Sequence, residues 1–94
     1  MVKDKLIGYL NICKKAGYLI IGGENLENYS KKLYLVIYDV SSQKNTQKIV
    51  EKLKNKNINV IGIENLEDVT KINNCKIIGI KNKNLSEIIF SFIN

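Results

Sequence analysis

The sequence predicts an α/β fold, a three-layer α/β/α sandwich around a central, mixed sheet of about four strands. Patterns typical of helices and strands alternate along the whole chain, which favours helices packed on a central sheet. The segment Leu33 to Val40 has apolar side chains at both odd and even positions, as in an interior strand covered on both faces. A length of 94 residues, without a linker or repeat, predicts a single domain over residues 1–94.

The first two elements follow from helical spacing and from glycines. Apolar residues recur one helical turn apart between Lys3 and Ala16, which predicts a helix. Gly17 follows at the position where left-handed backbone commonly ends a helix. The apolar run Tyr18 to Ile21 lies between Gly17 and the pair Gly22-Gly23, which predicts a short strand that ends in a turn.

The middle of the chain predicts a helix, a strand and a second helix. Glu24 to Ser30 is expected to be a short helix, because its acidic residues complement the helix dipole. Leu33 to Val40 is rich in β-branched and aromatic residues and is the best strand candidate. Asn45 to Asn55 predicts a basic amphipathic helix, with one apolar stripe and its lysines largely outside.

The last third predicts two more strands and two more helices. The strands are expected over Asn57 to Ile63 and Lys76 to Lys81, with a short helix over Asn65 to Ile72 between them. The final helix is expected over Leu85 to Ile93, because its apolar residues follow the i, i+3, i+4, i+7 rule. These residues are Leu85, Ile88, Ile89 and Phe92.

The charge of the chain favours a polyanionic partner. Lysine supplies all 15 basic residues, 9 residues are acidic, and the net charge is +6 with a pI near 9.3. An A+T-rich genome would also enrich lysine, asparagine and isoleucine, which lowers the weight of this argument. The charge is uneven, because residues 31–57 carry a net +5 and residues 58–75 a net −2.

Several classes of protein are disfavoured by what the sequence lacks. It has no histidine, and Cys13 and Cys75 lie far apart outside any CxxC pair, so we expect two buried, reduced thiols and neither a metal nor a cofactor. No apolar run approaches the roughly 18–20 residues of a membrane span, and no signal sequence is evident. We therefore expect a cytoplasmic protein without membrane contact.

Enzymatic motifs are also absent. The pair Gly22-Gly23 fits neither GxGxxG nor the GxxxxGK[ST] spacing, which disfavours a nucleotide pocket. Asp39 ends the best strand, where active sites of α/β proteins commonly lie, and a phospho-acceptor role in a small enzyme or signalling receiver is one hypothesis. The alternative is that Asp39 caps the following turn, which we favour.

RNA binding is the third hypothesis, because polar residues and lysines gather at the ends of the predicted elements. Backbone amides and short polar side chains can bond base edges, while lysines hold phosphates. The candidate residues are Gly22, Gly23, Glu24 and Asn25 after the first strand, Lys31 and Lys32 before the second, and Thr70 to Asn74 before the fourth. For Lys44 to Lys56, a solvated helix face is an equal alternative.

Four stretches carry a resemblance to a known family. They are LIGYLNICKKAG from Leu6 to Gly17, GENL from Gly23 to Leu26, LYLVIYDVSSQKNT from Leu33 to Thr46, and the chain from Leu66 onward. In order and spacing they resemble the ribosomal L-seven-Ae/L-thirty-e superfamily, most closely its small bacterial YlxQ-like members. The resemblance implies an α/β/α fold that binds kink-turn or similar internal-loop RNA in ribosomal or other ribonucleoprotein particles, without catalysis.

The resemblance also implies two RNA contacts. The turn after the first strand would bind sheared G·A pairs through Gly22, Gly23, Glu24 and Asn25, and the loop before the last strand would hold an extruded nucleotide at Thr70, Lys71 and Ile72. The chain departs from the family where Tyr18 and Asn28 replace lysines and where Leu66-Glu67 lacks the family's glycines, and its segment between Leu26 and Leu33 is several residues shorter.

Two hypotheses on function follow. The first is a monomeric, non-enzymatic protein that binds structured RNA and associates with the ribosome or another ribonucleoprotein. The alternative is a ribosome-associated protein-interaction module of the same fold whose RNA site has decayed at the departed positions.

Overall fold

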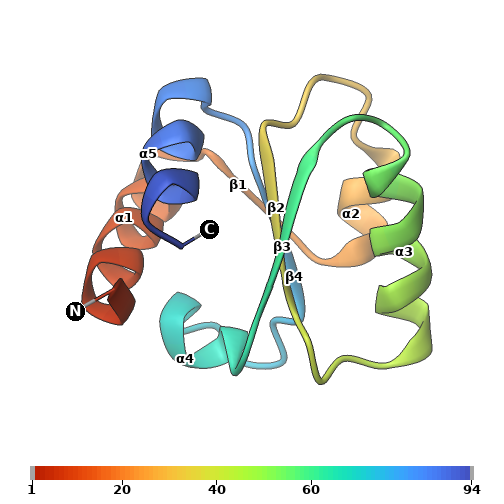
Figure 1. Cartoon of the computed structure of the whole chain (residues 1–94), viewed down its shortest axis with the longest axis horizontal. Coiled ribbons are helices and arrows are strands. Elements are labelled where there is room, and N and C mark those ends of the chain that lie inside the picture. Colours follow the sequence, from red (N-terminus) through yellow and green to blue (C-terminus); the bar gives the residue numbers. More distant parts are fainter. Residues whose placement is uncertain (1, 94) are drawn as a thin grey trace.

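The alternating pattern folds into five helices and four strands over residues 2–93, which the computed structural model describes (Figure 1). The helices are α1 (Val2–Ala16), α2 (Gly23–Asn28), α3 (Lys44–Lys54), α4 (Leu66–Thr70) and α5 (Lys83–Ile93). The strands are β1 (Leu19–Ile21), β2 (Leu35–Asp39), β3 (Asn59–Ile63) and β4 (Ile77–Ile80). Each corresponds to an element that the sequence predicts.

The four strands form one mixed sheet, as predicted, and their order in it is β1-β4-β2-β3. Strands β2 and β3 are parallel, and β4 runs antiparallel to both of its neighbours. Ile80 at the end of β4 lies opposite both Leu19 and Leu35, which begin β1 and β2. The starts of β1, β2 and β3 therefore share one end of the sheet with the end of β4.

Helices cover both faces of this sheet and complete the predicted three-layer sandwich (Figure 1). On one face α1, α4 and α5 enclose a core that includes Leu10, Leu66 and Ile89. On the other face α2 and α3 enclose a second core that includes Leu26 and Leu53. The central strands β2 and β4 are buried almost throughout, which explains why the side chains on both of their faces are apolar.

The residues at the element ends explain where the predicted bounds shift. Helix α2 stops at Asn28, short of the predicted Ser30, because Tyr29 is already extended. Helix α4 stops at Thr70, short of the predicted Ile72, because Lys71 adopts left-handed backbone with φ 60°. Gly17, with φ 77°, ends α1 as predicted, and the Tyr18 N–H donates to the Cys13 carbonyl across it.

The predicted apolar stripe of α5 is wrong at one position. Ile88 is 41% exposed, while Ser86 and Ile89 are buried against the sheet. The helix is therefore rotated so that a small polar residue takes a core position that the spacing assigns to isoleucine.

Both cysteines are buried and free, as predicted. No helix among residues 2–93 is long and apolar enough to cross a membrane.

Candidate nucleic-acid interface

The sheet has two chemically different ends, which organise the candidate site. We call one the Gly22 end: it comprises residues 22–25, 39–43 and 64–76, which follow β1, β2 and β3 and precede β4. We call the other the lysine end: it comprises residues 29–34, 54–58 and 81–83, which precede β2 and β3 and follow β4. Strands of about five residues separate the two ends by about 17 Å.

The turn after β1 is built on Gly22. Its φ of 93° and ψ of 145° lie in a region that is essentially restricted to glycine. The Gly22 N–H donates to the Ile77 carbonyl at 3.1 Å, which fixes the turn beside the start of β4. The Asn25 side-chain N–H donates to the Ile21 carbonyl at 2.8 Å, and the Asn25 side-chain oxygen takes no part in this bond. Glu24 and Asn25 are both exposed on this turn.

Gly23 lets α2 pack closely on its neighbours. A side chain at this position would collide with Ile49 of α3 and would approach Ile77 to 3.9 Å. The glycine pair therefore has two separate structural roles, positive φ at Gly22 and close packing at Gly23. These roles are also what hold Glu24 and Asn25 in place at the sheet end.

The loop before β4 lies at the same end of the sheet, on the side of α1. Thr70 is 4% exposed, so its side chain is not accessible as a direct RNA contact. Its hydroxyl donates to the Leu66 carbonyl at 3.1 Å and accepts the Ile72 N–H at 3.3 Å. Lys71 is exposed beside Asp68, with 3.9 Å between charged atoms, and Ile72 is half-buried. Thr70 therefore shapes the loop that presents Lys71.

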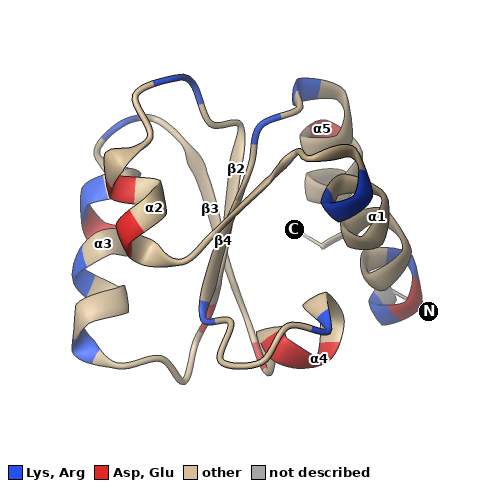
Figure 2. Ribbon diagram, turned by 180° about the vertical axis from the view of Figure 1, so that it is seen from behind, with Lys and Arg blue, Asp and Glu red and all other residues tan. Residues whose placement is uncertain are grey.

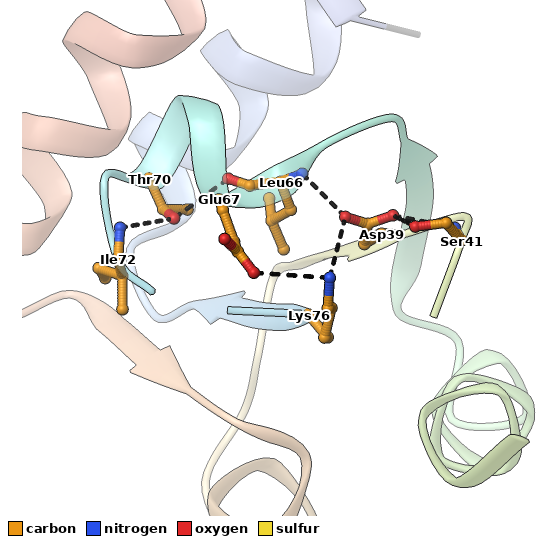
Figure 3. A network of polar contacts seen from close by, with 7 residues as sticks. All are labelled: Asp39, Ser41, Leu66, Glu67, Thr70, Ile72 and Lys76. Atoms are coloured by element: carbon orange, nitrogen blue, oxygen red, sulfur yellow. Dashed lines mark hydrogen bonds and ion pairs between the residues drawn. The ribbon is translucent and has the colours of Figure 1, made fainter. Parts of the chain in front are cut away.

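Asp39 connects this loop to the end of β2 (Figure 3). Its Oδ1 accepts hydrogen bonds from the Ser41 hydroxyl at 2.6 Å and the Ser41 N–H at 2.9 Å. Its Oδ2 accepts the Leu66 N–H at 3.1 Å and lies 3.9 Å from Lys76 Nζ, which in turn lies 3.6 Å from Glu67. The residue is 1% exposed.

These contacts hold the Asp39 carboxylate in its charged form. The Ser41 hydroxyl contributes most to lowering the pKa of Asp39 below its ordinary value, helped by the N–H groups of Ser41 and Leu66 and by Lys76, while burial opposes it. The preferred hypothesis for Asp39, that it caps the following turn, is confirmed. Because both oxygens are engaged and the group is buried, the geometry gives no support to a phospho-acceptor role.

Lys31 and Lys32 lie at the lysine end, away from the other predicted contacts. They precede β2, whose first residue pairs with Asn59 and Ile80, whereas the Gly22 turn adjoins the opposite end of β4. The structure therefore brings the Gly22 turn and the loop before β4 to one end and leaves these two lysines at the other. The nine predicted residues therefore do not gather at one end of the sheet.

The charges divide between the two ends (Figure 2). At the lysine end, the segments before β2 and β3 and after β4 carry lysines and no acidic residue. They hold Lys31, Lys32, Lys54, Lys56, Lys81 and Lys83. At the Gly22 end, the acidic residues are Glu24, Asp39, Glu64, Glu67 and Asp68, and the lysines are Lys71 and Lys76. The lysine end is therefore basic, and the acidic residues outnumber the lysines at the Gly22 end.

Sequence reasoning missed several of these residues. Lys76, Lys81 and Lys83 carry no local motif, and only the folded chain shows that Lys83 lines the same hollow as Lys32. A hollow of about 540 Å³ between α1, α4 and α5 was also not foreseen, and its rim includes Glu64 and Asp68. Among residues 2–93, no three His, Cys, Asp or Glu side chains are placed to hold a metal ion.

The two thiols are unsuited to nucleophilic chemistry in this fold. Burial raises the pKa of Cys13 and of Cys75, which keeps both as neutral thiols near pH 7. They pack in the core shared by α1, α4 and α5.

Comparisons with known proteins show the fold. No protein-family model matches the chain, and no curated protein matches it. A solved structure described as that of a protein with unknown function from Bacillus halodurans C is similar, with a TM-score of 0.80 and 22% sequence identity. The similarity covers 95% of this chain and 96% of that chain. The two proteins therefore share the architecture described above over nearly their whole lengths.

Proposed function

We propose that the protein binds structured RNA, of the kink-turn or internal-loop kind, without catalysis. The observation that carries the proposal is the juxtaposition of the Gly22 turn with the segment before β4, fixed by the Gly22 to Ile77 hydrogen bond of 3.1 Å. It gives a preformed end of the sheet with exposed Glu24, Asn25 and Lys71. Sequence-specific RNA recognition commonly uses such rigid polar edges against unstacked bases.

The fold and the charge add support of a more general kind. A net charge of +6 favours approach to RNA, and the lysines contribute salt-dependent affinity. We place the protein in the cytoplasm as a monomer, in a ribosomal or other ribonucleoprotein complex, because the resemblance in the sequence implies such particles.

The test compares two RNAs of equal length, a kink-turn and a straight duplex, in a gel-shift titration. The proposal expects tighter binding of the kink-turn and loss of that preference in Asn25→Ala, whose side chain fixes the turn. Asn84→Ala, at an exposed position on α5, is the matched control. Equal affinity of the unaltered protein for both RNAs would refute the proposal.

A gain-of-affinity variant provides a second arm. Asn28 is exposed at the end of α2, at the position where the resemblance places a lysine. Asn28→Lys is expected to tighten kink-turn binding because it adds a positive charge to the helix that follows the turn. Asn11→Lys adds the same charge at an exposed position on α1, which covers the other face of the sheet, and should improve affinity for both RNAs equally.

The acidity of the Gly22 end favours a second candidate, a protein-interaction module that is associated with the ribosome. Exposed Glu24 and the half-buried Glu67 and Asp68 would repel phosphates and could instead pair with basic side chains of a protein. Affinity capture with and without nuclease treatment distinguishes the two candidates. A protein partner that remains after RNA is removed, and that Glu24→Lys releases, would favour the module.

A further inference from the structure

The lysine end forms a second, separate surface with its own shape. Two hollows meet there, and Lys32 lines both of them. One, of about 380 Å³, is lined by Lys31, Lys32 and Lys56 together with Tyr29; the other, of about 240 Å³, adds Lys83. Because the hollows share Lys32, the lysines form one continuous basic surface.

The basic residues of this surface outnumber its acidic ones. Among the described residues that line the two hollows, Glu87 is the one acidic side chain. The ion pairs of the structure lie elsewhere, for example between Lys52 and Glu27 and between Lys76 and Glu67. Within residues 2–93, no salt bridge engages Lys31, Lys32, Lys56 or Lys83. No carboxylate of the described residues therefore lies within salt-bridge distance of these four ammonium groups.

The hollows present no fully exposed apolar anchor. The exposed large apolar residues of the described chain are Ile12, Val40 and Ile88, and none of them lines either hollow. The aromatic residues that do line the hollows, Tyr29, Tyr34 and Phe90, are half-buried. Protein interfaces centre on apolar and aromatic anchors, whereas surfaces that bind nucleic-acid backbones are polar and strongly basic. The Tyr34 ring is occupied by Lys32, whose Nζ lies 5.3 Å from the ring centroid.

We propose that the lysine end binds the sugar-phosphate backbone of an RNA segment different from the one at the Gly22 end. This inference rests on the proposed function only in taking RNA as the ligand. The lysine end would contact phosphates and needs no particular base. The two ends lie about 17 Å apart through the strands of the sheet, so two RNA segments can be bound at once. The protein then bridges RNA segments rather than capping one.

The experiment measures affinity for a straight RNA duplex by fluorescence anisotropy at several KCl concentrations. The test variant is Lys31→Gln/Lys32→Gln/Lys83→Gln. The control is Lys5→Gln/Lys44→Gln/Lys48→Gln, which removes the same charge from exposed positions on α1 and α3. The expected result is a slope of log affinity against log salt that becomes shallower by about two to three in the test variant and by less than about one in the control.

The outcomes separate this inference from the proposed function. Equal slope changes in the two variants, or no duplex binding by the unaltered protein, would overturn the inference. Displacement of RNA by polyglutamate at equal charge concentration would also overturn it, in favour of an acidic protein partner. Loss of kink-turn preference in Asn25→Ala, with unchanged duplex binding, would show that the two surfaces act independently. Absence of kink-turn preference in the unaltered protein, with duplex binding dependent on the lysine end, would refute only the proposed function.

Discussion

The Gly22 end and the lysine end of the sheet differ in how much of their polar chemistry is used internally. At the Gly22 end, Asp39 alone accepts three hydrogen bonds, and Thr70 and Asn25 each bond to backbone. At the lysine end, the lysines of the two hollows extend from the connecting segments without a carboxylate partner among the described residues. The polar residues of the Gly22 end therefore stabilise the fold, whereas the lysines of the lysine end remain available to a ligand. Substitutions at the two ends should therefore separate stability from binding.

The largest effect is expected for Asp39→Asn. This change removes a buried negative charge and turns an acceptor toward the Leu66 N–H into a donor, so the free energy of unfolding should fall by about 2–4 kcal/mol. Urea unfolding followed by circular dichroism measures it. Glu51→Gln, at an exposed position on α3, is the control and should change stability by less than about 0.5 kcal/mol. An equal, small effect of both changes would contradict a structural role for Asp39.

The lowered pKa of Asp39 predicts that the stability of the protein depends on pH. Because the pKa of Asp39 is lower in the folded chain than in the unfolded chain, its contribution is fully present above the unfolded pKa and is lost as pH falls through the folded one. The stability gap between the unaltered protein and Asp39→Asn should therefore be constant near pH 6–7 and should narrow below about pH 4. Unfolding curves at intervals of half a pH unit test this, and a gap that widens in acid would refute it.

A smaller loss is expected for Gly22→Ala. The backbone of Gly22 lies where a side chain is strained, and the substitution should cost about 1–3 kcal/mol. Gly8→Ala is a control of opposite sign, because Gly8 lies in α1 with open space around it and alanine favours the helix by up to about 1 kcal/mol. Thermal unfolding of both variants measures the contrast. If both stabilised the protein, the strain at Gly22 would be disproved.

Thr70→Val should have a still smaller effect. It keeps the shape of the side chain but removes the hydroxyl that bonds Leu66 and Ile72, at a cost of about 1–2 kcal/mol. Thr46→Val on α3 is the matched substitution at a half-buried position and should remain within about 0.5 kcal/mol of the unaltered protein. Hydrogen exchange at the Ile72 amide, which should become faster in Thr70→Val alone, localises the effect to the loop.

The smallest effect on stability is expected at the lysine end. Replacing Lys31, Lys32 and Lys83 together by alanine should leave the free energy of unfolding within about 0.5 kcal/mol, because these side chains are exposed and make no salt bridge among the described residues. Denaturant melts provide the measurement. A loss above about 1.5 kcal/mol would show that this end also has a structural role, and the contrast between the two ends would disappear.

The sequence could predict all the elements and the layers because these depend on local periodicity. The helical spacing before Gly17 and the apolar run of β2 both specify local structure directly. The rotation of α5 could not be predicted, because Ile88 and Ser86 exchange exposure through packing against the rest of the fold. The spacing of apolar residues predicts which side of the helix is apolar, and contacts with the rest of the fold decide which residues at the border of that side are buried.

The candidate site was predicted only in part, for a related reason. The Gly22 turn carries its own signal, a glycine pair after an apolar run, whereas its position beside the start of β4 follows from the hydrogen bond between Gly22 and Ile77. The location of Lys31 and Lys32 depends on the direction of β4 between β1 and β2, which no local pattern contains. The burial of Thr70 depends likewise on α1, whose Lys14 reaches the Thr70 carbonyl at 3.5 Å.

The place of β4 in the sheet has a consequence for the way the chain reaches its native state. Strand β4 is the last to be synthesised, yet it lies between β1 and β2 and pairs with both. Its contact with β1 closes a loop of about sixty residues, a non-local pairing of the kind that slows folding. Until residues 77–80 have left the ribosome, β1 has no neighbouring strand, and the sheet between the two cores lacks one of its two central strands. Folding is therefore expected as one late, concerted event, in which the Gly22 end and the lysine end form together.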